Sequence, residues 1–150
     1  MAFIPDKDKN DLKRRLQKEL TNVVTIKLFT QAATILIIPG RECPSCTPTQ
    51  QLLEELVALS PKLHLEVVNF YGVPEEARKH GVERIPAIVL DGAGEASIKF
   101  YGLPSGYEFV TILEDIIGVS RRLSGLKMET RKKLRQVNQP VHMQVFVTPT

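Results

Sequence analysis

The residues of this chain that could do redox chemistry lie in the segment GRECPSCTP, residues 40–48, which holds its only two cysteines, Cys43 and Cys46. Two thiols separated by two residues can form and break a disulfide, can supply two ligands to a metal ion, or can be inert. A purely structural disulfide is disfavoured, because so small a loop removes little entropy from the unfolded chain. The spacing therefore favours a redox centre.

A metal site is the first alternative. Zinc usually takes about four ligands, and beyond the cysteines the chain offers His64, His80 and His142, no two of which show ligand spacing. A metal held within one chain is therefore disfavoured, and we expect no metal and no other cofactor. A zinc or iron–sulfur site shared by two chains stays open, and so do inert cysteines.

The cysteines are expected at the start of a helix. Leucines recur at helical spacing in TPTQQLLEELVALSP, residues 47–61, so Cys43 is predicted at the N-cap and Pro44 at the first helical position. A thiolate there faces unpaired backbone N–H groups and the positive end of the helix dipole, which favour the charged form. Cys46, one turn further in, is predicted to be more shielded. The pair thus resembles an exposed attacking thiol with an inner resolving one.

A second unusual segment is Arg84-Ile85-Pro86-Ala87, which opens an otherwise strand-like run. Proline removes a hydrogen-bond donor from a sheet, so it is tolerated at the first residue of a strand or as a cis peptide in a tight turn. The segment alone leaves both alternatives open.

The other patterns predict the elements that must position these two segments. A stripe of leucines indicates a first helix through about Leu20, capped by Asp6 or Asp8. Further elements are predicted in this order: strands at 23–30 and 33–39, the cysteine-bearing helix, a strand at 62–70, a short helix at 74–82, a strand at 85–91 turned by Gly92-Ala93-Gly94 into a hairpin partner, and a helix from about Ser105. This order predicts an α/β fold with a mixed central sheet flanked by helices.

The C-terminal part repeats the pattern of the opening. Residues 127–137 predict a basic helix, and PVHMQVFVTPT, residues 140–150, predicts a strand, much as residues 9–30 do. We therefore predict one unit at 1–120 and the start of a second unit at 121–150, the alternative being two unrelated helix–strand pairs. A lone strand exposes unpaired backbone groups, so Val141 to Val147 are expected to pair with another chain or with the edge of the first unit.

Composition excludes several classes of protein. The net charge of +3 is too small to indicate nucleic-acid binding, and no apolar run is long enough for a signal peptide or a membrane helix. A cytoplasmic location is expected. The basic pairs and runs at Arg121-Arg122 and Arg131 to Arg135 are interpreted as solvated helix faces rather than anion sites.

A strand-to-helix turn with Cys-x-x-Cys, followed by an apolar-proline strand entry, resembles the thioredoxin fold. The segments RIPAIVL and KFYGLPSGYEFVTILEDIIGVS, then a basic helix and QVFVTPT, are similar to the glutaredoxin-like protein disulfide oxidoreductases of thermophiles. The resemblance implies thiol–disulfide exchange, with Cys43 attacking and Cys46 resolving. It also implies a cis Pro86 beside the disulfide, substrate contacts from Pro44, Ser45 and the Ile85 backbone, and reduction by a partner reductase.

The chain departs from that family in two places. The family carries a second Cys-x-x-Cys after a strand like QVFVTPT, whereas this sequence holds only the first helix and strand of a second unit. The approach to the first motif is also long, and Ala33 to Glu42 is either an additional strand or an insertion. A thioredoxin-fold assembly module with little redox activity, oligomerising through its C-terminal strand, therefore remains the alternative function. Glu66 or Lys27 could be a buried proton acceptor for Cys46, but outward-facing charges on alternating strands are the favoured interpretation.

Overall fold

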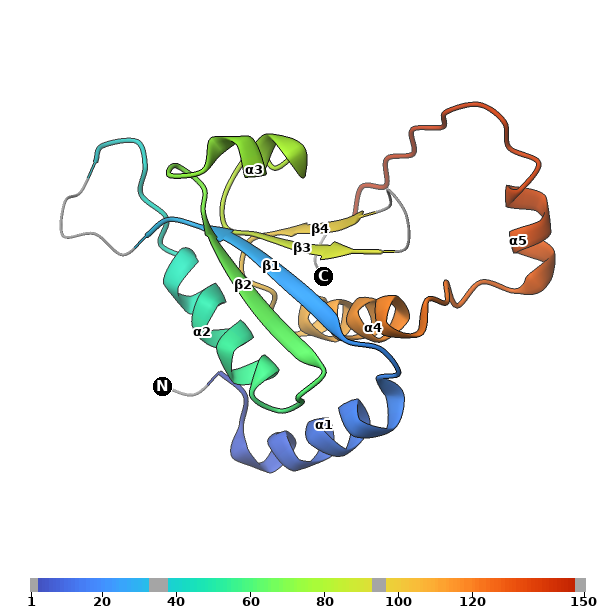
Figure 1. The fold of residues 1–150 in the computed structure, drawn as a ribbon, viewed down its shortest axis with the longest axis horizontal. Helices are drawn as coiled ribbons and strands as arrows, with labels where there is room; N and C mark the ends of the chain where they lie inside the picture. Colours follow the sequence, from blue (N-terminus) through green and yellow to red (C-terminus); the bar gives the residue numbers. More distant parts are fainter. Residues whose placement is uncertain (1–2, 33–37, 93–96, 148–150) are drawn as a thin grey trace.

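A computed structural model describes residues 3–32, 38–92 and 97–147 of the chain (Figure 1). Its centre is a four-stranded sheet in the order β2-β1-β3-β4. The strands are β1 (Val24–Thr30), β2 (Leu63–Asn69), β3 (Ala87–Asp91) and β4 (Ser97–Tyr101). β1 pairs in parallel with β2 and antiparallel with β3, and β3 and β4 form the predicted antiparallel hairpin. The expected mixed sheet is confirmed.

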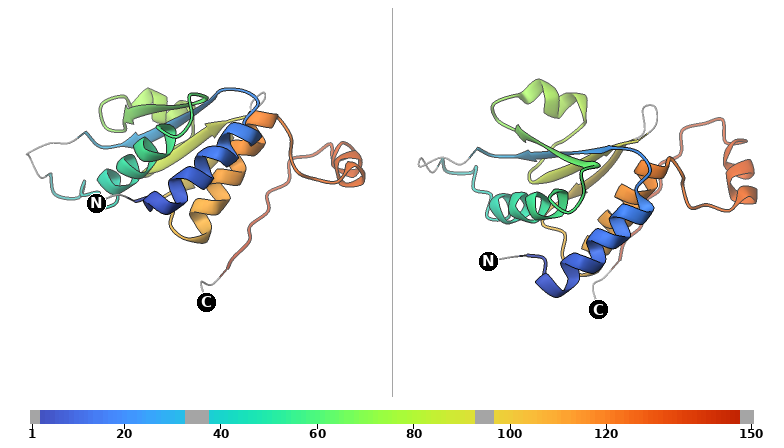
Figure 2. Two further views of the ribbon diagram at one scale, coloured as in Figure 1. Left: turned by 90° about the horizontal axis from the view of Figure 1, so that it is seen from below. Right: turned by 60° about the horizontal axis from the view of Figure 1, so that its bottom comes forward.

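Helices cover both faces of this sheet (Figure 2). Their bounds are α1 (Asp6–Glu19), α2 (Cys46–Val57), α3 (Pro74–Lys79), α4 (Tyr107–Arg121) and α5 (Met128–Leu134). α1, α2 and α4 lie on one face, and α3 lies on the other. Each helix predicted within residues 1–120 is present. α1 begins after Pro5 with no side-chain cap, so the predicted aspartate cap is wrong.

The alternation of β1 divides the core in two. Ile26 and Leu28 point into the larger core with the leucines of α2 and the isoleucines of α4. Phe29 points to the opposite face, where it packs with Ala77 of α3 and Val89 of β3. Because successive side chains of a strand point to opposite faces, the central strand anchors both layers.

Two polar contacts tie distant parts of the chain together. Ser120 at the end of α4 is fully buried; its hydroxyl accepts the backbone N–H groups of Thr21 and Asn22 (3.0 Å each) and donates to the Asn22 carbonyl (2.6 Å). At the other end, the Glu55 carboxylate accepts the N–H groups of Phe3 (2.9 Å) and Ile4 (3.0 Å). These bonds hold both ends of α1 against the rest of the molecule.

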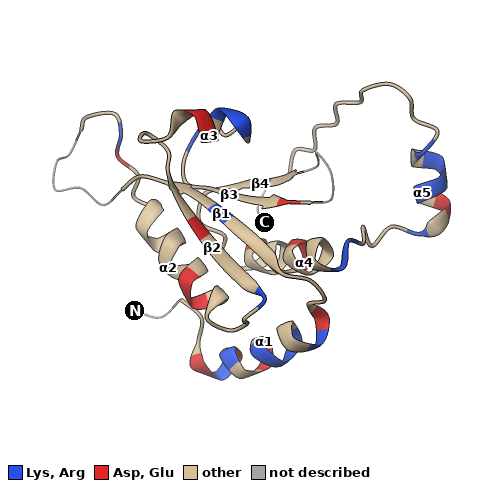
Figure 3. Cartoon of the chain, in the orientation of Figure 1, with Lys and Arg blue, Asp and Glu red and all other residues tan. Residues whose placement is uncertain are grey.

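The C-terminal segment, residues 122–147, which we call the arm, carries α5 out to one side of the sheet, and the chain after α5 turns back in the view of Figure 1. The basic helix is confirmed as α5, and Figure 3 shows its cluster of lysines and arginines. The strand predicted at 140–150 is not formed in its described part, 140–147. A β-rich segment becomes a strand only when a neighbour pairs with it, and this one pairs with neither edge of the sheet.

Two further predictions fall on residues that are not described. The strand expected at 33–39 lies mostly within 33–37, and the turn Gly92-Ala93-Gly94 lies mostly within 93–96, so both are outside the described residues. Over the described ranges, no helix combines the length and the apolar character needed to cross a membrane.

Candidate active site

Cys43 and Cys46 are joined by a disulfide, with their Cα atoms 5.4 Å apart. The Cys46 N–H donates to the Cys43 carbonyl (3.1 Å), which closes a tight turn around Pro44 and Ser45. Cys46 is 2% exposed and Cys43 is partly exposed, so the predicted difference in shielding is confirmed. In this arrangement an incoming group meets Cys43 first.

The helix begins later than predicted. Its N-cap is Ser45, and its first regular bond runs from the Thr49 N–H to the Ser45 carbonyl (3.0 Å). The reason is Pro48, because a helix capped at Cys43 would need an N–H at that position to reach the Pro44 carbonyl, and proline has none. The Cys43 N-cap and the Pro44 first-turn position are therefore wrong, and Cys43 lies in the turn before the helix.

The second segment enters β3 through a cis peptide bond between Ile85 and Pro86, one of the two alternatives left open by the sequence. Pro86 is buried, and its carbonyl accepts the N–H of Gly102 (2.9 Å). Ile85 is partly exposed and lies before the first ladder pair, Phe29 with Ala87. Its backbone makes no bond to the backbone of another described residue.

Sheet register brings the two segments to one end of the molecule. Ala87 at the start of β3 pairs with Phe29 near the end of β1, and the chain leaves β1 there towards the cysteines. Figure 1 shows α2 beginning at the same end of the sheet. Pro44 is exposed and Ser45 is partly exposed beside the disulfide.

Two arginine–tyrosine pairs at these segments were not predicted. The Arg41 guanidinium lies 4.5 Å from the ring centre of Tyr71, and that of Arg84 lies 4.6 Å from the ring centre of Tyr101. Such cation–π contacts contribute roughly 0.5–1 kcal/mol at exposed sites. They link the loop before Cys43 to the end of β2 and the loop before Pro86 to β4. No sequence signal reveals them, because the partners are distant in the chain.

The proton-acceptor alternative for Lys27 and Glu66 does not fit the structure. The two side chains approach each other at 3.8 Å across the β1–β2 register. Lys27 shares its face of β1 with Phe29, which packs on α3, whereas α2 covers the other face. The Lys27 ammonium lies 3.2 Å from Nε2 of His80, which follows α3. Both charges therefore lie across the sheet from Cys46, and Glu66 is half-exposed as expected.

The placement of the side chains that could serve as metal ligands bears on whether this chain could bind a metal ion. Among the described residues, no group of three or more histidine, cysteine, aspartate or glutamate side chains is placed to hold a metal ion. The two sulfurs are bonded to each other, and a metal would need them as separate thiolates. The geometry is that of a dithiol/disulfide couple.

Known proteins are similar to this chain in sequence and in fold. The sequence profile of the thioredoxin domain family matches residues 33–114, more than half of the chain. A thioredoxin of Methanocaldococcus jannaschii is 28% identical over 83 residues, covering 55% of this chain and 82% of the thioredoxin.

Two solved structures resemble the whole fold. The alkylhydroperoxide reductase protein AhpF of Enterococcus faecalis matches 88% of this chain and 60% of its own, with a TM-score of 0.71 and 25% identity. A protein disulfide oxidoreductase from Aeropyrum pernix matches 89% of this chain and 55% of its own, with a TM-score of 0.73 and 23% identity, a likeness of fold. The chain thus spans less than two thirds of either protein.

Proposed function

Because this chain belongs to the thioredoxin domain family, we propose that it is a thiol–disulfide oxidoreductase that exchanges disulfides with protein substrates through Cys43 and Cys46. The observation that carries the proposal is the disulfide at the start of α2, in which Cys43 is partly exposed and Cys46 is buried. That difference in access gives the two cysteines separate roles.

Reduction of a substrate proceeds in two exchanges. The Cys43 thiolate attacks one sulfur of the substrate disulfide, forming a mixed disulfide and releasing the first substrate thiolate. The Cys46 thiol, after losing its proton, attacks the Cys43 sulfur, so the mixed disulfide breaks and the second substrate thiolate leaves. The substrate gains two electrons and two protons, and the protein loses them as the Cys43–Cys46 disulfide forms. Run in reverse, the same steps oxidise a dithiol.

The substrate segment is proposed to lie across Pro44, Ser45, Ile85 and Pro86. Ile85 supports this role because its backbone lies outside the ladder at the end of the sheet where α2 begins. An extended segment can pair with such free backbone groups by hydrogen bonding. A reductase that returns electrons to the disulfide is a further partner we propose, in the cytoplasm.

Insulin reduction with dithiothreitol as the electron source tests the proposal. We expect turnover by the full chain, loss to background in Cys43→Ser, and accumulation of the mixed disulfide in Cys46→Ser, because the resolving thiol is then absent. Ser124→Ala in the arm, remote from both sulfurs, serves as the matched control. Turnover equal to background in the unmodified chain, or retained by Cys43→Ser, would refute the function.

One observation favours a second candidate, an assembly module of thioredoxin fold. Every residue from 121 to 147 is exposed, including Phe146 at 90% and Met143 at 80%. Residues 141–147 of this segment are mostly apolar, and soluble proteins rarely leave such a stretch uncovered unless it binds something. A stable oligomer combined with no insulin turnover would favour this candidate.

A further inference from the structure

An apolar pocket of about 500 Å³ opens between α1, α2 and α4. Its walls are Leu12 of α1, Leu52 of α2, Phe109 and Leu113 of α4, and Phe3 and Leu103 from the connecting segments. At its mouth Val110 is 49% exposed, and Phe3 is 38% exposed. Exposed apolar side chains that line an apolar hollow mark a binding surface.

The pocket adjoins both halves of the candidate active site. Leu52 follows Cys46 by six residues on α2, which is a rise of about 9 Å along the helix. Leu103 directly follows Gly102, whose N–H donates to the Pro86 carbonyl. The Cα atom of Cys43 lies 5.4 Å from that of Cys46, so the two cysteines are roughly 9 to 14 Å from Leu52. An extended chain advances roughly 3.3 Å per residue and covers that distance in about three to four residues.

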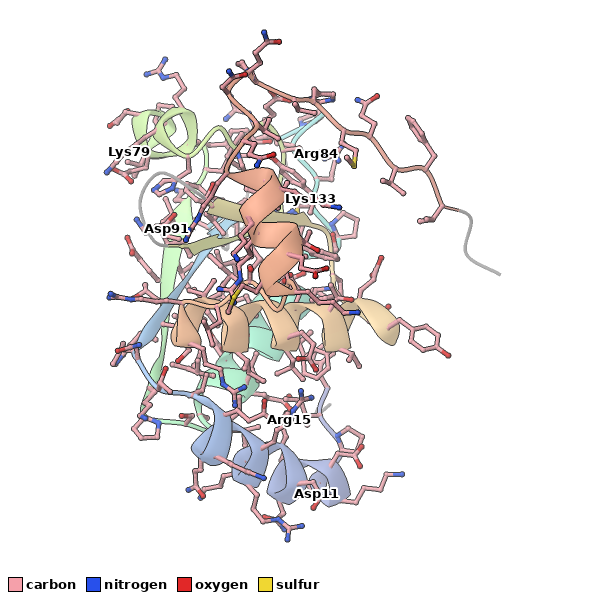
Figure 4. The ribbon with its side chains drawn as sticks, turned by 90° about the vertical axis from the view of Figure 1, so that its right-hand side faces the viewer. Asp11, Arg15, Lys79, Arg84, Asp91 and Lys133 are labelled. Atoms are coloured by element: carbon pink, nitrogen blue, oxygen red, sulfur yellow. A yellow bond between two sulfur atoms is a disulfide. The ribbon has the colours of Figure 1, made fainter. Side chains whose placement is uncertain are left out.

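The charges at the rim of the pocket indicate which charged residues a bound peptide should carry beside it. Asp8, Asp11 and Arg15 line one side, and Arg15 is bonded to Glu19 and Glu114 and lies between α1 and α4 (Figure 4). Asp11 contacts Arg14 on the outer surface, whereas Asp8 forms no ion pair with another described residue. The charge of Arg15 is therefore already balanced by Glu19 and Glu114. The remaining acidic groups at the rim favour a bound peptide with a basic residue there over one with an acidic residue.

We propose that this pocket is a docking subsite for one large apolar side chain of the protein substrate. That side chain lies three to four residues from the cysteine that reacts with Cys43, and a lysine or arginine beside it is preferred to an acidic residue. The subsite rests on the proposed exchange activity and adds substrate selection to it.

Peptides with one cysteine in a mixed disulfide with glutathione test the subsite. Paired peptides carry leucine or serine four residues from the cysteine, on either side of it, with lysine or glutamate adjacent. We expect the unmodified full chain to reduce the leucine–lysine peptide with a kcat/KM at least about tenfold above that of the serine peptide, as burial of one apolar side chain implies. Glutathione disulfide, which cannot reach the pocket, gives the basal rate.

Two variants at valines of similar exposure test whether the leucine preference arises in the pocket or from any polar substitution on the surface. Val110→Asn at the mouth should bring the leucine/serine ratio close to one, while Val137→Asn in the arm, where the valine is 53% exposed, should leave the ratio unchanged. Both should reduce glutathione disulfide at the unmodified rate.

The outcomes are distinguishable. Turnover without a leucine preference, or a preference kept in Val110→Asn, overturns the subsite alone. A change of oligomeric mass in Val110→Asn also overturns it, because the pocket then receives a second copy of the chain. Absence of turnover with every disulfide refutes the proposed function and, with it, the subsite.

Discussion

Glu55 shows how one side chain on α2 fixes the start of the chain. Both carboxylate oxygens accept backbone N–H groups, one from Phe3 and one from Ile4, and Ile4 is buried at 3% exposure. The N–H of Phe3, then that of Ile4, holds the pKa of Glu55 below its ordinary value of 4.5, because both bonds favour the charged form. The contact also shapes the pocket, since Phe3 and Ile4 are part of its wall.

The lowered pKa makes this contact pH-dependent. Its contribution to stability is complete above the unfolded value of 4.5 and is lost as the pH falls through the lower folded pKa. Glu55→Gln keeps one acceptor and leaves an N–H unpaired, so we expect a loss of about 1 kcal/mol at neutral pH. Thermal unfolding of both proteins from pH 7 to pH 3 checks this.

The difference in Tm should shrink on acidification, while Gln51→Ala on the exposed face of α2 should give no pH-dependent difference. A constant gap between Glu55→Gln and the unmodified chain over the whole range would contradict the assignment.

At the scale of elements, the alternating side chains of β1 give the two faces of the sheet different characters. Its α2 face is apolar, and its α3 face carries Lys27, whose side chain is 18% exposed. The Lys27 ammonium lies 3.2 Å from Nε2 of His80, and Nδ1 of the same ring lies 3.6 Å from a carboxylate oxygen of Asp91. These polar contacts hold α3 onto the sheet.

Lys27→Met tests whether that polar face is independent of the redox face. Methionine fills a similar volume and the half-exposed Glu66 can return to water. Nε2 of the nearly buried His80 loses its partner, however, so we expect a loss of about 1–3 kcal/mol in the free energy of unfolding. Insulin turnover should stay within twofold. A tenfold loss of turnover with an unchanged Tm would show that Lys27 acts on the cysteines after all.

Elements with strong periodicity were predictable from the sequence alone. The leucines of α1 and α2, the alternating strands and the hairpin located the fold, and the cysteine pair with Pro86 located the candidate site. These features depend on local patterns that the sequence carries directly.

The predictions that were wrong, and the features that were missed, depend on contacts with other residues rather than on the local pattern. Pro48 moved the start of α2 by withholding one N–H, although the leucine pattern around it is helical. The segment 140–147 has the composition of a strand but no partner in the described structure. The pocket, and the contacts of Arg41 and Glu55, join residues that only the fold brings together.

At the scale of the whole molecule, the arm is the least covered part. Val141, Val145 and Val147 are between 70% and 83% exposed, and the segment from 141 to 147 carries no charged lysine, arginine or acidic side chain. In the described part of the chain it covers neither the pocket nor a sheet edge. The division into a unit at 1–120 and the start of a second unit at 121–150 stays a prediction.

We expect the arm to drive self-association of this chain. Light scattering during gel filtration should show a mass above 16.8 kDa that rises with concentration. The double change Met143→Lys and Val145→Lys should return the monomer, because burying two ammonium groups in an apolar contact is costly. Val23→Lys, at a position 60% exposed outside the arm, is the control. A monomeric mass for the unmodified chain throughout would remove this prediction.

The sheet order has a consequence for what counts as the smallest folding unit. The family profile begins at residue 33, after β1 has ended at Thr30. Yet β1 is the strand that joins β2 to β3, and among the described strands β2 pairs with β1 alone. A fragment cut at the start of the family match would leave β2 alone and both cores without their central side chains. The segment that matches the family profile, residues 33–114, is therefore shorter than the segment needed to build the sheet and its two cores.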